Sequence, residues 1–114
     1  MRTVVAIDAH EIPRRAPVRV VAGDEVTASE RDAQWPAFVF VTATQGAGSV
    51  PARQLSADAG PATVLTPYDT TELPTQPGQI LTMLHEDPES GWHWCRDASR
   101  RERWVPARSL RDRV

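Results

Sequence analysis

Residues 50–55 read Val-Pro-Ala-Arg-Gln-Leu, and residues 105–110 read Val-Pro-Ala-Arg-Ser-Leu. The two hexapeptides lie 55 positions apart and differ at a single position. The same offset carries Gly-Asp-Glu-Val at residues 23–26 onto Gly-Gln-Ile-Leu at residues 78–81. Self-similarity at one period indicates a duplicated structural unit. The chain has 114 residues, enough for two units of about 55 residues, which is near the lower limit for independent folding.

A short connector separates the two copies. Residues 56–62 read Ser-Ala-Asp-Ala-Gly-Pro-Ala, and small residues around a Gly-Pro pair are typical of a connector. We therefore predict one unit over residues 1–57 and a second over residues 58–114. Because the connector is short, the two units are expected to touch or nearly touch.

The local pattern favours strands over helices. The 10 prolines are scattered along the chain and leave few windows long enough for a helix. Short runs of β-branched and aromatic residues alternate with turn signals, which is typical of strands. The predicted strands are residues 3–7, 25–29, 36–42, 63–65, 79–85, 92–96 and 103–105. Residues 47–49 and 88–91 are interpreted as turns, and the segment after each last strand as one 3₁₀ turn.

Composition bounds the class of protein. All 13 basic residues are arginine, which indicates the coding bias of a GC-rich genome. No stretch approaches the roughly 18 apolar residues needed to span a bilayer, and the first apolar run is too short for a signal peptide. The single cysteine, Cys95, excludes an intrachain disulfide. We expect a cytoplasmic protein with no membrane contact.

The second half resembles Src homology 3 (SH3) domains. Residues 64–69 are similar to the family's Ala-Leu-Tyr-Asp-Tyr segment, residues 78–81 to its Gly-Asp-x-Leu, and residues 103–110 to its Gly-Tyr-Ile-Pro-Ser-Asn-Tyr-Val. Residues 89–92, Glu-Ser-Gly-Trp, resemble the approach to the family's groove tryptophan. The first half is a degenerate copy, with Trp35 in the place of that tryptophan. The resemblance implies an all-β chain of two tandem SH3-like five-stranded β-barrels.

Seven apolar residues are expected to fill the core of the second unit. They are Val64, Leu73, Leu81, Met83, Cys95, Val105 and Leu110. Burying each large apolar side chain contributes roughly 1.5–3 kcal/mol, against a chain entropy of roughly 1–2 kcal/mol per residue. A single unit of this size is therefore marginal, and we expect the two halves to unfold as one cooperative unit.

The resemblance also implies a shallow aromatic surface that binds proline-rich peptides in the polyproline II conformation. Its expected residues are Tyr68, Trp92, Trp104 and Pro106, flanked by the acidic residues Asp69, Glu72 and Glu89. Neighbouring carboxylates favour a basic ligand residue. The predicted function is a non-enzymatic protein-interaction module that binds an extended, basic peptide or a protein surface. The alternative is a structural or oligomerising subunit whose groove is occupied by a neighbouring domain or chain.

Other kinds of chemistry have less support. Arginines around Trp104 would suit single-stranded nucleic acid, but the net charge of −2 argues against that partner. His93 and Cys95 point the same way on a strand, yet zinc needs at least three protein ligands. Motifs of common catalytic sites are missing from the sequence. We expect no enzyme, metal or cofactor, while self-association stays open.

Overall fold

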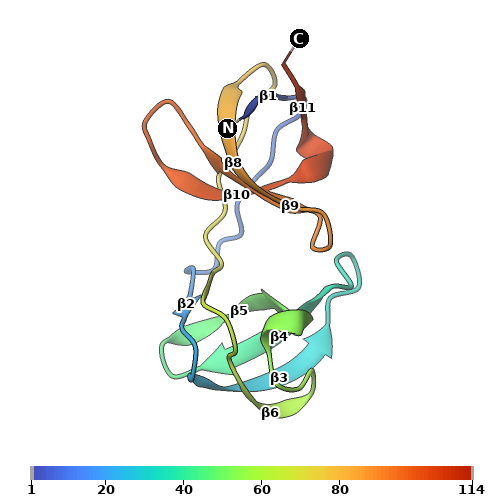
Figure 1. Cartoon of the computed structure of the whole chain (residues 1–114), viewed down its shortest axis with the longest axis vertical. Helices are drawn as coiled ribbons and strands as arrows, with labels where there is room; N and C mark the ends of the chain where they lie inside the picture. Colours follow the sequence, from blue (N-terminus) through green and yellow to red (C-terminus); the bar gives the residue numbers. More distant parts are fainter. Residues whose placement is uncertain (1, 114) are drawn as a thin grey trace. The chain divides into compact units, whose positions relative to one another are not determined.

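The computed structural model describes residues 2–113, and strands make up most of its regular structure (Figure 1). The chain divides into two compact units. We call them the host unit, which combines Met1–Arg14 with Thr71–Val114, and the inserted unit, Arg15–Thr70. This division differs from the predicted one, because the expected boundary near residue 58 falls inside the inserted unit. Within the described part of the chain, no helix is long and apolar enough to cross a membrane.

The host unit is one antiparallel five-stranded sheet with the order β10-β9-β8-β1-β11. Its elements are β1 (Arg2–Ala6), β8 (Ile80–Asp87), β9 (Trp92–Arg96), β10 (Glu102–Pro106), the 3₁₀ turn η2 (Ala107–Ser109) and β11 (Leu110–Asp112). β1 pairs with β8 on one side and with β11 on the other. In Figure 1 this dark blue strand therefore lies among the orange and red strands of the second half of the sequence.

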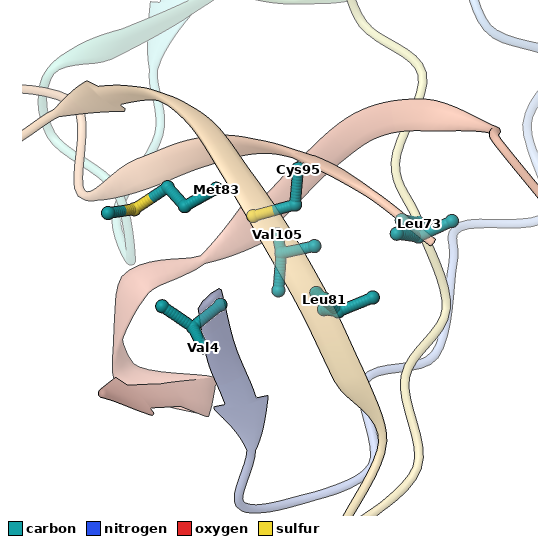
Figure 2. Packing of buried hydrophobic residues seen from close by; sticks show 6 residues of the cluster. All are labelled: Val4, Leu73, Leu81, Met83, Cys95 and Val105. Atoms are coloured by element: carbon teal, nitrogen blue, oxygen red, sulfur yellow. The ribbon is translucent and has the colours of Figure 1, made fainter. Parts of the chain in front are cut away.

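The core of the host unit matches the sequence prediction except at one residue. Its buried residues are Val4, Leu73, Leu81, Met83, Cys95 and Val105 (Figure 2). Leu110 is partly buried against them. Six of the seven predicted core residues are thus found together. The seventh, Val64, is buried in the inserted unit instead, and Val4 from the start of the chain joins the host core.

The inserted unit contains a four-stranded sheet of order β5-β4-β3-β6 and a two-stranded sheet of β2 and β7. Its elements are β2 (Arg19–Val20), β3 (Glu25–Arg31), β4 (Phe38–Ala43), β5 (Gly46–Pro51), η1 (Ala52–Gln54), β6 (Gly60–Thr63) and β7 (Tyr68–Asp69). The two predicted 3₁₀ turns are confirmed as η1 and η2. Among residues 2–113 no sheet closes on itself, so the all-β class is confirmed but closed five-stranded barrels are not observed.

The two units have exchanged their first strands. In the host unit, the Gly78 N–H donates to Ala6 O at 2.8 Å, and in the inserted unit the Gly23 N–H donates to Val64 O at 2.8 Å. The glycines are related by the repeat offset of 55, whereas Ala6 and Val64 are 58 positions apart. Further matching backbone bonds are Ala6–Gln79 with Val64–Asp24, and Ile7–Ser109 with Leu65–Gln54. Each sheet therefore receives its first strand from the other half of the sequence.

The short segment after β6 explains why this strand does not stay with its own half. In the inserted unit the Thr70 N–H donates to Val18 O at 3.0 Å, and Val18 corresponds to Leu73 at the repeat offset. If β6 paired within its own half, Thr70 would lie opposite Leu73, and Thr71 and Glu72 would have to form a two-residue turn. Such turns require positive φ angles, which a β-branched threonine and a glutamate disfavour.

The chain instead continues in the extended direction into the host unit. There the Trp104 N–H donates to Thr71 O at 3.0 Å, and the Leu73 N–H donates to Trp104 O at 2.9 Å. Glu72 forms a parallel bridge with Trp104. The segment 71–73 therefore satisfies backbone groups along the outer edge of β10, where a tight turn would have left them unpaired.

Two local predictions were wrong for the same reason, which is that pairing within the inserted unit was not anticipated. The predicted connector, residues 56–62, lies inside that unit: its first part reverses the chain and its last three residues belong to β6, with Leu55 bridged to Val64 and the Ser56 N–H donating to Thr63 O at 2.9 Å. Residues 47–49 belong to β5 and are not a turn. A Cβ on Gly48 would lie 3.0 Å from Val18 Cγ1, so this glycine allows close packing and does not reverse the chain.

Candidate functional site

Trp92 is held on two sides at the start of β9. It lies opposite Pro106 on β10, and its ring meets the ring of His10 edge-to-face, with 5.4 Å between centroids and 77° between planes. Its backbone N–H donates to Ser90 Oγ at 3.2 Å. Edge-to-face contact at this separation is a favoured aromatic geometry. Only 8% of Trp92 is exposed, so its ring supports the surface from below.

His10 is brought to Trp92 by the exchanged strand. The segment after β1 bridges to Thr75, and the two residues exchange backbone hydrogen bonds of 3.2 Å. His10 Nε2 lies 2.7 Å from Glu72 Oε1, and both side chains are largely buried, at 15% and 21% exposed. The imidazole is therefore held between a carboxylate and an indole ring.

Trp94 and Trp104 form a second ring pair, on the same face of the sheet. Trp94 is two residues from Trp92, so their side chains leave β9 on one side. Trp94 lies opposite Trp104 on β10, with 5.0 Å between ring centroids and 74° between planes. The Trp94 Nε1–H donates to Glu102 Oε1 at 3.4 Å. Both rings are half-buried, which leaves part of each accessible to a ligand.

The inserted unit repeats the first ring pair with different residues. Phe38 at the start of β4 lies opposite Pro51, and its ring meets that of Tyr68 at 6.4 Å and 66°. Phe38 and Tyr68 are only 6% and 8% exposed. Phe40, which occupies the position of Trp94, is covered by the Arg15 guanidinium 5.0 Å above the ring centroid, a cation–π arrangement. Each unit thus pairs a buried ring with a second ring and places that buried ring opposite a proline.

The strand exchange divides the predicted site between the units. Trp92, Trp104, Pro106, Glu72 and Glu89 lie in the host unit, and Tyr68 and Asp69 lie in the inserted unit. The place expected for Tyr68 beside Trp92 is taken by His10, which is 58 positions earlier, the offset of the exchanged strands. Asp69 is 3.2 Å from the Arg19 guanidinium, and Glu89 is exposed in the turn after β8.

Three residues that contact predicted site residues were missed: His10 and Trp94 in the host unit, and Phe38 beside Tyr68 in the inserted unit. Trp35 was expected to stand in the tryptophan position of the first half, but Phe38 does so, because it pairs with Pro51 as Trp92 pairs with Pro106. Trp94 could have been found from its spacing of two from Trp92. His10 could not be found by motif comparison, because the segment that carries it was assigned to the other unit.

Cys95 is fully buried in the host core, as predicted, and burial raises the pKa of its thiol to about 12. An unfolded cysteine ionises near pH ~8.5. As pH rises, the thiol therefore ionises in the unfolded state before it ionises in the native state. The stability that the buried, neutral thiol contributes is constant below the ionisation of the unfolded thiol and declines as pH rises towards 12. We expect the stability advantage of wild type over Cys95→Ala, measured by urea unfolding, to narrow above about pH 9.

Thiol labelling checks the same point directly. Iodoacetamide at pH 8 should modify Cys95 in urea within minutes and leave the native protein largely unlabelled, because the reactive species is the thiolate. Rapid labelling of the native chain would contradict the burial of this side chain.

The face of the host sheet that carries Trp94 and Trp104 presents aromatic ring surface and carboxylate acceptors, which are groups that can bind a ligand. Among residues 2–113, no group of three or more histidine, cysteine, aspartate or glutamate residues is arranged to hold a metal ion. Comparisons with known family models, curated proteins and solved structures gave no significant match to this chain.

Proposed function

We propose that the chain is a non-enzymatic interaction protein made of two modules of the SH3 type that have exchanged their first strands. Three features support this assignment. Each unit pairs an aromatic residue at the start of a central strand with a proline on the next strand, and each ends that strand in a 3₁₀ turn. The repeat motifs at residues 50–55 and 105–110 supply both prolines and both turns.

The ligand face is the pair Trp94 and Trp104, and this half-buried pair is the observation that carries the proposal. Trp92 and Pro106 are buried beneath the same face. Rigid aromatic rings provide contact area at low entropic cost. Glu102 accepts a hydrogen bond from the Trp94 indole, so a carboxylate adjoins the ring pair. The ligand that fits is an extended peptide with a basic residue, whose binding weakens as salt rises.

Replacing Trp104 with alanine tests this function. A peptide selected from a displayed random library against the full chain should bind with micromolar affinity. Trp104→Ala should then weaken binding by roughly 30-fold, equivalent to about 2 kcal/mol at a hot spot. Isothermal titration calorimetry measures the loss, and circular dichroism confirms that the sheet is intact. Trp35→Ala removes a ring from the inserted unit and serves as the matched control, with unchanged affinity.

Burial of the other rings favours a second candidate function. Trp92, Phe38 and Tyr68 are each at most 8% exposed, which suits a structural or oligomerising subunit whose aromatic positions stabilise the fold. Under that function no library peptide is enriched, and Trp104→Ala lowers the melting temperature without affecting any binding. A 30-fold loss of peptide affinity in a folded Trp104→Ala protein would exclude it.

A further inference from the structure

We infer that a second copy of this chain is a binding partner, joined by exchange of β1 between the two molecules. The inference does not depend on the proposed peptide-binding function. It starts from the fact that the host sheet already takes its first strand from a distant part of the sequence. β1 and β8 are separated by the whole inserted unit, so no short connection holds β1 in its place.

β1 makes contacts along both of its edges and through its buried face in the host sheet. β1 pairs with β8 from Arg2 to Val5 and with β11 from Val4 to Ala6. Val4 and Ala6 are 2% and 1% exposed in the host core. The Arg2 guanidinium also contacts Glu86 at 2.6 Å and Asp112 at 2.9 Å. The β1 of a second copy would make every one of these contacts, because the sequences are identical.

The first of the two connections between the units is the one suited to exchange. Residues 11–17 are all exposed and include Pro13 and Pro17, which have no backbone N–H to pair with either unit. The second connection is fixed at both ends. Val18 N–H donates to Thr70 Oγ1 at 2.8 Å, and Trp104 N–H donates to Thr71 O at 3.0 Å. β1 is therefore the strand that can leave while the second connection keeps its hydrogen bonds.

Exchange of β1 between two chains preserves the contacts that β1 makes within one chain, so the equilibrium between monomer and exchanged dimer depends on protein concentration. Residues 11–17 and the inserted unit tether β1 to the rest of the host sheet, so the tethered strand competes with a second copy at an effective concentration of about a millimolar. Dimers should therefore accumulate when the protein refolds at about 1 mM and remain scarce at micromolar concentration. This sets the conditions in which the partner can be detected.

Two single-cysteine chains test the inference. One carries Val5→Cys and the other Ile80→Cys, both on a Cys95→Ala background. Val5 lies opposite Ile80, and because the next pair is hydrogen-bonded through Ala6 N–H and Gln79 O, this pair is of the closely spaced, non-hydrogen-bonded type. Val5 is half-buried and Ile80 is 45% exposed, so both substitutions are mild. Neither chain can form an internal disulfide.

The two chains are mixed in denaturant, refolded at about 1 mM in a glutathione redox buffer, and analysed by non-reducing electrophoresis and intact mass. We expect the yield of disulfide-linked Val5→Cys/Ile80→Cys heterodimer to be at least five times the yield of heterodimer from a control mixture of Val5→Cys with Val21→Cys. Val21 is 50% exposed and lies in the inserted unit. Equal yields from the two mixtures would overturn the inference.

Wild-type protein provides a second measurement that needs no substitution. After refolding at about 1 mM, light scattering on a sizing column should detect a dimer that returns to monomer when diluted and briefly unfolded. A chain that stays wholly monomeric after this treatment would also overturn the inference.

Discussion

We expect that residues 58–114, expressed alone, will not form the five-stranded sheet of the host unit. The fragment lacks β1, which is a central strand between β8 and β11, and it lacks Val4 from the core. The fragment's own first strand, β6, cannot take the place of β1 beside β8. The chain would then have to reverse in a two-residue turn at Thr71 and Glu72, which these residues disfavour. Circular dichroism and the dispersion of amide NMR signals should report an unfolded or aggregated chain.

A permuted chain is the matched control for this experiment. β1 and β11 are antiparallel neighbours, with Val4 opposite Asp112 and the Arg113 N–H donating to Thr3 O at 3.3 Å. Residues 71–113 can therefore be joined through a short Gly-Ser linker to residues 2–14, which restores β1 to the sheet. This chain should fold. A fragment 58–114 that melts at the temperature of the full chain would contradict the exchanged arrangement.

Val4→Asn and Val64→Asn should each destabilise the protein by about 3 kcal/mol or more. Both valines are buried, at 2% and 1% exposed. Each substitution loses the roughly 1.5–3 kcal/mol of a buried valine and leaves an amide without a partner, at a further cost of about 1–3 kcal/mol. A loss of this size is a large part of the stability of a small protein.

The location of the damage discriminates between contiguous and exchanged halves. Hydrogen exchange followed by mass spectrometry should show lost protection in β8 and β9 for Val4→Asn, and in β3 and β4 for Val64→Asn. Each valine would thus affect strands from the opposite half of the sequence. Damage confined to residues 1–57 by Val4→Asn would contradict the pairing of β1 with β8. Leu65→Ala, at a leucine 55% exposed, is the control and should change stability by less than about 0.5 kcal/mol.

The sequence was sufficient to predict most strands and most of the host core. The strand at residues 92–96 was predicted with the bounds that β9 has, because alternating aromatic and apolar residues follow a turn signal. Leu73, Leu81, Cys95 and Val105 were predicted in the core and are buried there. These predictions depend on local pattern, which the exchange of strands does not alter.

The partner of each first strand could not be predicted from the same pattern. Val4 and Ala6 in β1 correspond to Ala62 and Val64, so both strands present small apolar residues with the same alternation and fit either sheet. One signal was present in the short spacing between Tyr68 and Leu73. With so few residues between Tyr68 and Leu73, the second half cannot turn back and place its own first strand beside β8. The first strand therefore stays in the inserted unit with Tyr68 and Asp69, which divides the predicted binding site.

The exchange also determines the order in which the protein can fold during its synthesis. Of these strands β1 is made first, whereas its neighbours β8 and β11 are made only after the whole inserted unit. Strand β3 appears much earlier, and its side that later pairs with β6 is vacant until residues 60–63 emerge. Because β1 carries the same pattern as β6, it can occupy that side of β3 while the chain is still growing. A molecule in which β1 does so reaches the native pairing of β3 with β6 only after β6 has displaced β1.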